Sequence, residues 1–220
     1  MPYSDLELFN ILFEDDNIIA VDKPAGIASI SESNTSIQTI HSLLEKKFSA
    51  KIYIVHRIDK EASGVILFAK NPKTHKYLND LFANRSIKKN YTVLVNGVIK
   101  EESGKIDKPI REFGSGRMGI DETKGKNSIT NFKTIKRFKE FTLLDVSIET
   151  GRRHQIRVHL YSIGHPVAGD LKYGEKISQS RIPRLMLHAS RIEFMSLNNE
   201  NKIISSPLPE QFQKFLENLS

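Results

Sequence analysis

Cysteine is absent from the chain of 220 residues, and its absence excludes disulfide bonds and cysteine-based metal or redox chemistry. Long apolar runs are lacking too, since a run such as Val65–Ala69 is far shorter than a membrane-spanning segment. The stretch Met1–Asp5 has no basic region leading into an apolar one, so it does not indicate a secretory signal. Hydrophobic residues make up 39% and charged residues 27% of the chain, which is typical of a soluble globular protein. We therefore expect a cytoplasmic location and no association with membranes.

The positive charge is concentrated in one part of the sequence. The net charge is +7, and residues 85–139 contain 14 basic and 6 acidic residues. The rest of the chain has 19 basic and 20 acidic residues, so it is nearly neutral. A local basic excess is typical of a surface that contacts phosphates, although a solvated basic surface without a partner is also common. Nucleic acid is thus one candidate partner on charge alone.

Helix signals occur near the start of the chain and at its end. Thr35–Gln38 has the spacing of a capping box, and apolar residues follow it at helical intervals up to Phe48. Asn71 and Pro72 predict a second helix start, because asparagine caps helices and proline is favoured at the first helical position. The apolar residues between Phe212 and Leu219 indicate a short amphipathic helix.

Strand signals dominate the middle of the chain. Ile18–Val21 reads as a buried strand, Tyr91–Val95 is rich in residues that favour strands, and Phe141–Thr150 alternates between apolar and polar residues. Between the last two, Gly114–Ser128 has little apolar content and predicts an exposed loop or hairpin tip. The mixture of helix and strand has no regular βαβ alternation, which disfavours a doubly wound parallel sheet.

Three polar segments could carry chemistry. His56–Gly64 contains Asp59 and runs into an apolar strand, which places its side chains on a loop beside a sheet. A lone aspartate, however, is more often a turn or capping residue. Thr150–Leu160 reads as a strand end followed by a helix, whereas Lys88–Tyr91 leads basic residues into a strand through an aromatic, a pattern that ordinary packing also produces.

The helix expected within Thr150–Leu160 has a core face and a polar face. We expect Arg153 and Arg157 one turn apart on the polar face, together with His154. His154 and His159 do not have the four-residue spacing of helical zinc pairs, so we expect no metal site.

These motifs resemble those of the RluA-type pseudouridine synthases, which belong to the RsuA/RluA family. His56–Gly64 is similar to the motif His-Arg-Leu-Asp-x-x-Thr-Ser-Gly, and Thr150–Leu160 to Thr-Gly-Arg-x-His-Gln-(Ile/Leu)-Arg-Val-His. Asp22–Gly26 resembles the opening motif Asn/Asp-Lys-Pro-x-Gly. Further matches are found at Gly164–Asp170, Tyr173–Gly174 and Leu187–Ala189. The departures from the family pattern are Ile58 for leucine, Ala62 for threonine and Arg153 for a common threonine or serine.

The resemblance implies an α+β fold class, namely the pseudouridine synthase fold. This fold has a mixed, largely antiparallel sheet in two lobes with a central catalytic cleft, in which Asp59 would lie. The matches run from about Phe13 to Phe194, so the resemblance implies a single catalytic domain over residues 1–220. The N-terminal S4 domain of many relatives is not expected.

The implied activity is the isomerisation of uridine to pseudouridine in structured RNA, a tRNA or rRNA stem-loop, by a monomer without cofactor or metal. By resemblance Asp59 is the catalytic carboxylate, Tyr91 stacks on the uracil, and Arg157 pairs with Asp59. Because the target nucleotide should be flipped out, Arg57 would fill the vacated space. The other residues expected to contact RNA are Lys89, Arg152, His154, Lys124 and Lys126.

Two alternatives come from other classes. One is a non-catalytic RNA-binding protein that retains the fold, but binding alone does not require a carboxylate among phosphate-binding arginines. The other is a hydrolase that uses Asp59 with His56 or His154. The sequence has no recognisable nucleophile elbow or metal spacing for such an enzyme.

Overall fold

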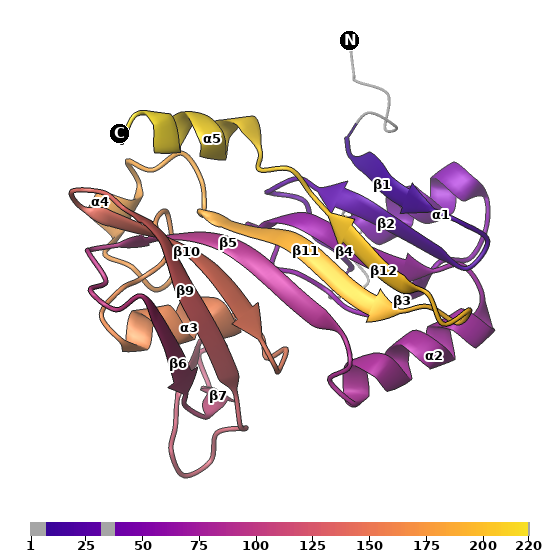
Figure 1. Cartoon of the computed structure of the whole chain (residues 1–220), viewed down its shortest axis with the longest axis horizontal. Coiled ribbons are helices and arrows are strands. Elements are labelled where there is room, and N and C mark those ends of the chain that lie inside the picture. Colours follow the sequence, from indigo (N-terminus) through magenta and orange to yellow (C-terminus); the bar gives the residue numbers. More distant parts are fainter. Residues whose placement is uncertain (1–7, 32–37, 220) are drawn as a thin grey trace. The chain divides into compact units, whose positions relative to one another are not determined.

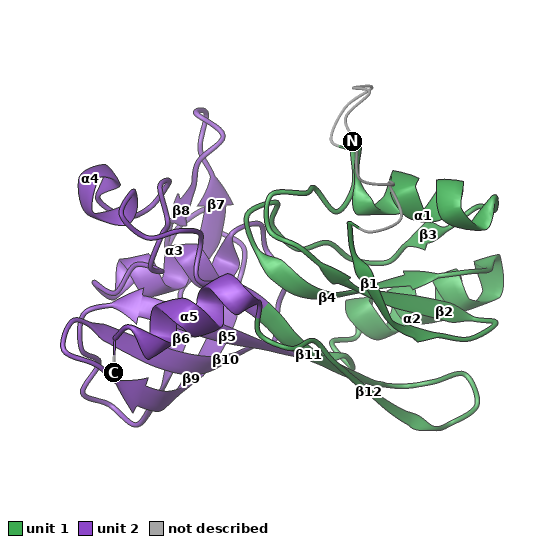
Figure 2. Ribbon diagram, turned by 90° about the horizontal axis from the view of Figure 1, so that it is seen from above, with its two compact units in different colours: residues 1–88, 189–208 green, residues 89–188, 209–220 purple. Residues whose placement is uncertain are grey.

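The computed structural model describes residues 8–31 and 38–219, which divide into two compact units (Figures 1 and 2). Unit 1 comprises residues 1–88 and 189–208, and unit 2 comprises residues 89–188 and 209–220. Each unit combines helices with a largely antiparallel sheet, as the α+β expectation requires. Within the described part of the chain, no helix is both long and apolar enough to cross a membrane.

The sheet of unit 1 is built around the buried strand β4. Its strand order is β1-β2-β4-β11, with β12 beside β11 and the short β3 also paired to β4. Every residue of β4 is buried, and β2 pairs with it from Ile18 opposite Ala69 to Lys23 opposite Gly64. Only the part of β11 that follows His188 belongs to this unit. The bounds are β1 Asn10–Glu14, β2 Ile18–Lys23, β3 Tyr53–Ile54, β4 Ser63–Ala69, β11 Leu187–Met195 and β12 Asn201–Ser205.

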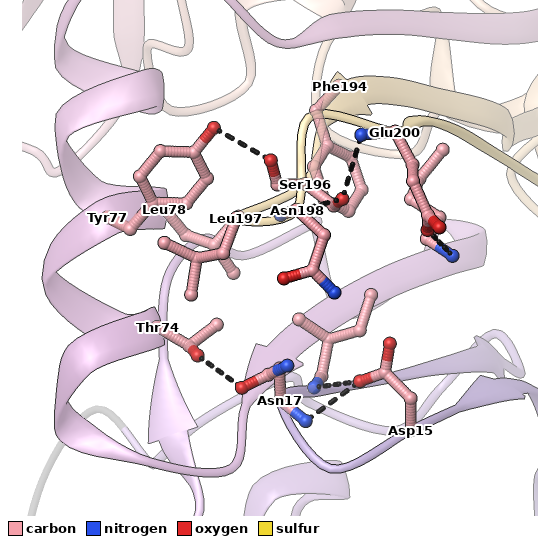
Figure 3. A pocket seen from close by; sticks show the side chains of 12 residues that line it. Asp15, Asn17, Thr74, Tyr77, Leu78, Phe194, Ser196, Leu197, Asn198 and Glu200 are labelled. Atoms are coloured by element: carbon pink, nitrogen blue, oxygen red, sulfur yellow. Dashed lines mark hydrogen bonds and ion pairs between the residues drawn. The ribbon is translucent and has the colours of Figure 1, made fainter.

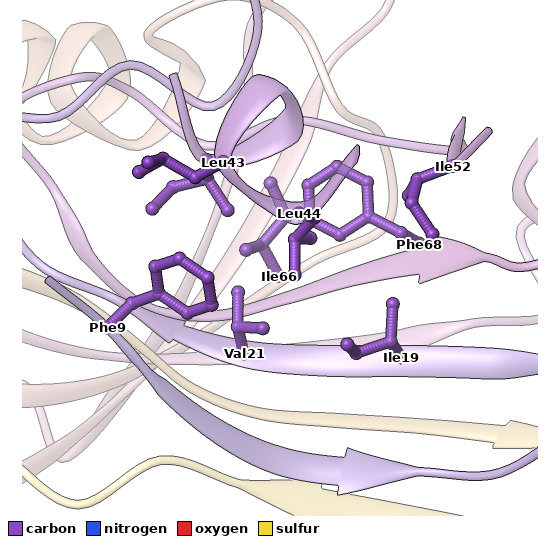
Figure 4. Close-up of a cluster of buried hydrophobic side chains, with 9 residues drawn as sticks. Phe9, Ile19, Val21, Leu43, Leu44, Ile52, Ile66 and Phe68 are labelled. Carbon is purple, nitrogen blue, oxygen red and sulfur yellow. The ribbon is translucent and has the colours of Figure 1, made fainter. Parts of the chain in front are cut away.

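One face of this sheet packs against helix α1 (Ile40–Phe48) through an apolar cluster (Figure 4). The cluster joins side chains from the strands with side chains from the helix and the segment after it. Burial of such side chains stabilises each by roughly 1.5–3 kcal/mol and fixes α1 against the sheet. Its buried members are Phe9, Ile19, Val21, Ile40, Leu43, Leu44, Ile52, Ile66 and Phe68.

The two helices of unit 1 test the capping predictions. Helix α2 (Pro72–Ala83) begins as predicted, with Asn71 as its cap and proline at its first position. Helix α1 begins later than predicted, because its capping box consists of Thr39 and Ser42. The backbone is still extended at Thr39, which forms a parallel bridge with Ala28. Of the capping box expected at Thr35–Gln38, residues 35–37 lie outside the described residues.

Unit 2 has a sheet in the order β5-β10-β9-β6 and a separate two-stranded sheet, β7-β8. The strand register places Tyr91 of β5 opposite Val146 of β10. Strands β7 and β8 form a hairpin whose tip falls at the start of Gly114–Ser128, the stretch expected to be an exposed loop or hairpin tip, but β8 also lies in this stretch and its Met118 is buried. The strands are β5 Lys88–Asn96, β6 Ser103–Asp107, β7 Ile110–Glu112, β8 Met118–Ile120, β9 Ile129–Arg137 and β10 Phe141–Ile148. The helices are α3 Gln155–Ser162, α4 Lys176–Gln179 and α5 Glu210–Glu217.

Helix α3 differs from the amphipathic helix expected at this position. It starts only after His154, so Arg153 precedes it and does not share a helical face with Arg157. Arg157 is buried, as are Gln155 and His159, so the expected polar face is wrong. These polar side chains serve neighbouring segments instead: the Gln155 amide, for example, donates to the carbonyl of Ile129 on β9.

Candidate active site

The loop that carries Asp59 lies between β3 and β4 in unit 1. His56, at the start of this loop, is held against β4, since its Nε2 atom accepts the backbone N–H of Leu67 at 2.9 Å. Its ring also stacks on Phe82 of α2 with a centroid distance of 4.9 Å. Because this Nε2 lone pair is already engaged, His56 is poorly placed to act as a general base there. The contact therefore assigns His56 a role in placing the loop.

A buried lysine holds the C-terminal side of Asp59. Lys23, the last residue of β2, is fully buried, and its Nζ atom donates to the carbonyls of Pro24 and Ile27, each at 2.8 Å. A third bond of 3.0 Å reaches the carbonyl of Lys60, the residue after Asp59. A buried ammonium group is tolerated when its protons are satisfied in this way. Lys23 thus ties the turn after β2 to the Asp59 loop.

The other side of Asp59 is anchored by a serine from the same turn. Ser29 donates its hydroxyl to the carbonyl of Ile58 at 2.8 Å and accepts the N–H of Ile58 at 3.2 Å. Gly26 donates its N–H to the carbonyl of Lys60 at 2.8 Å from a left-handed conformation with φ of 90°. Residues on both sides of Asp59 are therefore fixed through their backbone, while Asp59 itself is half-buried.

In unit 2, Arg157 of α3 is paired with a carboxylate that sequence reasoning did not identify. Its Nε and Nη2 atoms donate to the two oxygens of Asp170 at 2.7 and 2.8 Å. Both side chains are buried, and a bidentate pair of this kind fixes the plane of the guanidinium group. Asp170 is held in turn by the backbone N–H groups of Lys172 and Tyr173. Asp170 was part of a matched motif, which was the available signal.

Tyr173 connects Arg157 with His154. The guanidinium carbon of Arg157 lies 5.2 Å from the centroid of the Tyr173 ring, and the Tyr173 hydroxyl is 2.8 Å from His154 Nδ1. His154 has left-handed backbone angles, with φ of 56° and ψ of 20°. Such a conformation is uncommon for a residue with a side chain and persists where its surroundings hold it. His154, expected to contact RNA, is thus oriented by Tyr173.

Tyr91 and Lys89 lie on β5, and by strand alternation they share one face of the strand. Tyr91 is 9% exposed, whereas Lys89 is partly exposed. Burial lowers the pKa of the Lys89 amine below its ordinary value. A Cβ atom added at Gly151 would lie 3.9 Å from this amine, an ordinary van der Waals distance, so Gly151 is next to Lys89.

The remaining predicted RNA contacts lie on the surface. Arg57 is exposed on the Asp59 loop of unit 1. In unit 2, Arg152 is exposed just before α3, and Lys124 and Lys126 are exposed after β8. The structure brings His154 and Arg157 into one cluster, whereas Asp59 belongs to the other unit. Residues 8–31 and 38–219 contain no group of three or more potential metal ligands among His, Asp and Glu side chains.

Unit 1 also has a pocket between α2 and the turn that joins β11 to β12 (Figure 3). None of the predicted site residues lines it. Tyr77 donates its hydroxyl to the carbonyl of Met195 at 3.0 Å, and Asp15 accepts the N–H groups of Asn17 and Ile18. These bonds attach the turn to the helix and close the turn between β1 and β2, so we assign the pocket a structural role.

Comparisons with known proteins identify the family of the chain. The family model described as RNA pseudouridylate synthase matches residues 17–162. The ribosomal large subunit pseudouridine synthase C of Buchnera aphidicola is 34% identical over 96% of this chain and 71% of its own length. An uncharacterised RNA pseudouridine synthase of Zymomonas mobilis is 34% identical, over 92% of this chain and 94% of its own.

The fold is also found among solved structures. The human RNA pseudouridylate synthase domain containing 1 matches with a TM-score of 0.80 and 25% identity. The match covers 100% of this chain and 97% of the human one. The predicted fold and family are therefore confirmed: the chain belongs to the RNA pseudouridylate synthase family and isomerises uridine to pseudouridine in RNA.

Proposed function

We propose that this enzyme modifies a uridine in the RNA of the large ribosomal subunit, with Asp59 as its catalytic carboxylate. The relatives named as large-subunit synthases support the target. The anchoring of residues on both sides of Asp59 by Lys23, Gly26 and Ser29 carries the assignment of the carboxylate. A catalytic group must be held in a fixed geometry, and an ordinary surface aspartate has no need of such support.

The reaction breaks the bond between uracil N1 and ribose C1′, turns the base, and joins C5 to C1′. The proton on C5 leaves and N1 gains one, so the step is a redox-neutral isomerisation. In this proposal Asp59 acts as a carboxylate, which needs no activating base of the kind that a serine hydroxyl requires. It acts either by covalent addition or by stabilising charge at C1′ during elimination.

We assign Arg157 and Tyr91 to the same reaction. Arg157 donates through its Nε and Nη2 atoms to Asp170, which fixes the plane of the guanidinium group. In our proposal Arg157 supports the charge on Asp59, and Tyr91 stacks on the uracil ring. Arg57, Lys89, Arg152 and His154 contact the nucleotide and its neighbours, whereas Lys124 and Lys126 contact phosphates.

The decisive experiment compares the parent enzyme with the Asp59→Asn variant. The amide keeps the shape of the carboxylate and removes its charge, so pseudouridine formation in large-subunit rRNA should be abolished. RNA affinity and the free energy of unfolding should stay close to the parent values. Asp80→Asn, an exposed aspartate on α2 in the same unit, is the matched control and should be fully active. Substantial turnover by verified Asp59→Asn would refute the role of Asp59.

The target is tested in cells. Mapping pseudouridine in total RNA, with and without the gene, should show the loss of a large-subunit site. Loss of a tRNA site alone would refute the proposed target while leaving the activity intact. The proposal also includes a cytoplasmic monomer, which cell fractionation and light scattering can test.

A further inference from the structure

The β7-β8 hairpin of unit 2 has two different faces. In its register Ile110 is opposite Ile120, Glu112 is opposite Met118, and Arg111 is opposite Gly119. Ile110 and Met118 are buried in a cluster with Val158 of α3 and Tyr173. Because strand side chains alternate, Arg111 and Gly119 lie on the opposite face. The hairpin is thus fixed to α3 by one face and presents the other outward.

The outward face exposes an aromatic ring beside a guanidinium group. Phe113, the residue after β7, is 40% exposed. Its ring lies over Gly119, where a Cβ atom would come within 2.9 Å of Phe113 Cε2. A side chain at position 119 would displace the ring, so glycine allows it to lie close to the strands. The guanidinium carbon of Arg111 is 5.5 Å from the ring centroid.

Arg111 is held in place by a turn that also carries the two predicted phosphate contacts. Its Nη1 atom donates to Asp121 Oδ2 at 2.9 Å. The other oxygen of Asp121 accepts the backbone N–H groups of Thr123 and Lys124. The bond from Lys124, followed by that from Arg111, holds the pKa of Asp121 well below its usual range. The carboxylate therefore stays ionised, and Lys124 and Lys126 follow within the same turn.

The tip of the hairpin is anchored as well. Arg153, which departs from the family motif, donates through Nη2 to Glu112 Oε1 at 2.8 Å and to the carbonyl of Gly116. The guanidinium carbon of Arg117 lies 5.1 Å from the Tyr173 ring centroid. Phe113 and Arg111 therefore lie on a hairpin that is held at its tip by Arg153 and at the turn after β8 by Asp121. A rigid platform loses little conformational entropy when a ligand binds.

We propose that Phe113 and Arg111 form a stacking platform for an unpaired nucleobase of the RNA substrate other than the modified uridine. Unstacked bases in RNA loops bind to aromatic rings and to arginine planes. The exposed lysines of the neighbouring turn supply charge for the phosphates on either side of that base. The proposal rests on RNA being the substrate and adds a contact that no matched motif contains.

The test compares Phe113→Leu with Phe113→Tyr in the full-length enzyme. Leucine keeps the apolar packing on Gly119 but has no aromatic ring, whereas tyrosine keeps the aromatic ring. Using an rRNA transcript that the parent modifies, we expect Phe113→Leu to weaken binding by about fivefold to 20-fold. Because no phosphate contact is lost, the dependence of affinity on salt should stay unchanged. KM should rise in parallel, kcat should stay within about twofold, and Phe113→Tyr should bind like the parent.

Ile135→Ala, an exposed apolar residue on β9 of the same unit, is the matched control and should leave affinity unchanged. Parental affinity and KM in Phe113→Leu would overturn the proposal, and so would an equal loss in Phe113→Tyr or a changed salt dependence. Each of these results requires a parent enzyme that modifies the transcript used. An inactive parent would instead refute the choice of target RNA, so the two failures are distinguishable.

Discussion

The two units hold their proposed catalytic side chains in different ways. In unit 1 the residues on either side of Asp59 are bound through their backbone by Lys23 and Ser29. In unit 2 the guanidinium group of Arg157 is itself bound, by a bidentate pair with Asp170. The difference follows from side-chain length. A short carboxylate is placed once its backbone is placed, whereas a long arginine side chain has about 2 kcal/mol of rotamer entropy and must be fixed at its head group.

The two kinds of anchor also differ in which groups lose their partner when the anchor is removed. Loss of a backbone anchor leaves carbonyl and N–H groups without partners, each a moderate cost. Loss of one member of the buried ion pair leaves a charge without its counterion, which costs more. We therefore expect substitutions at the buried ion pair to cost more stability than substitutions at the backbone anchors.

The largest effect is expected from Asp170→Asn in unit 2. Asparagine replaces the bidentate carboxylate partner of the buried Arg157 with a neutral amide, so the free energy of unfolding should fall by about 3–5 kcal/mol. Pseudouridine formation should fall as well, because the guanidinium group loses its orientation. Urea unfolding and a turnover assay provide the measurements. Asp107→Asn, at a half-exposed pair with Lys105, is the control and should cost at most about 1 kcal/mol. Similar costs for both variants would contradict the contrast.

Lys23→Met in unit 1 should have the next largest effect. Methionine has nearly the same shape but cannot donate to the carbonyls of Pro24, Ile27 and Lys60, so unfolding should become easier by about 2–4 kcal/mol. The Asp59 loop should no longer be held in a fixed position, so kcat should fall about 10-fold or more while KM changes little. Lys73→Met, on the exposed side of α2, is the control. A parental kcat in Lys23→Met would show that the buried lysine does not position Asp59.

Acid should weaken unit 2 through His159. Its Nδ1 atom is 2.8 Å from Thr130 Oγ1, and its Nε2 atom is 2.9 Å from the carbonyl of Lys108. Burial, the largest cause, lowers the pKa of His159 below its ordinary value. In the unfolded chain the imidazole of His159 is protonated near pH 6.5, whereas in the folded chain it is protonated only at lower pH. The free energy of unfolding should therefore fall as the pH drops below about 6.5.

Hydrogen exchange at two pH values can measure this acid effect. Amides of α3 and β9 should lose protection between pH 7.5 and pH 5.5, and His159→Gln should reduce that difference. The pH dependence should be the same in parent and variant if His159 is irrelevant to it.

The smallest effect is expected from the double substitution Lys124→Gln and Lys126→Gln. RNA affinity should fall, and the salt dependence of binding should become flatter by about 1–2 units of slope, since fewer counterions are released. The modified uridine and kcat at saturating RNA should not change, because phosphate contacts do not read bases. Lys46→Gln with Lys47→Gln, exposed on α1 of unit 1, is the matched control. Equal slopes in both double variants would assign the RNA contact to another surface.

Much of the fold was accessible from local patterns. The cap and proline of α2 are encoded by two adjacent residues, and their helix starts where predicted. The start of α1 was misplaced because Thr35–Gln38 and Thr39–Ser42 both have cap-like spacing. What decided between them was the bridge of Thr39 to Ala28, a contact with another segment. The expected polar face of α3 failed for a similar reason, since Arg157 is buried against Asp170, a residue of the segment that follows the helix.

The family, the reaction and the aspartate to which we assign the chemistry could be predicted from short runs of residues. The residues that support this aspartate and Arg157 became visible in the folded chain. Ser29 has no motif that marks it, and Lys23 and Asp170 lie in motifs that do not state their contacts. Asp170 is 13 residues from Arg157, and Ser29 is 29 residues from Ile58. Such contacts depend on how the chain folds back on itself, which no local spacing of residue types encodes.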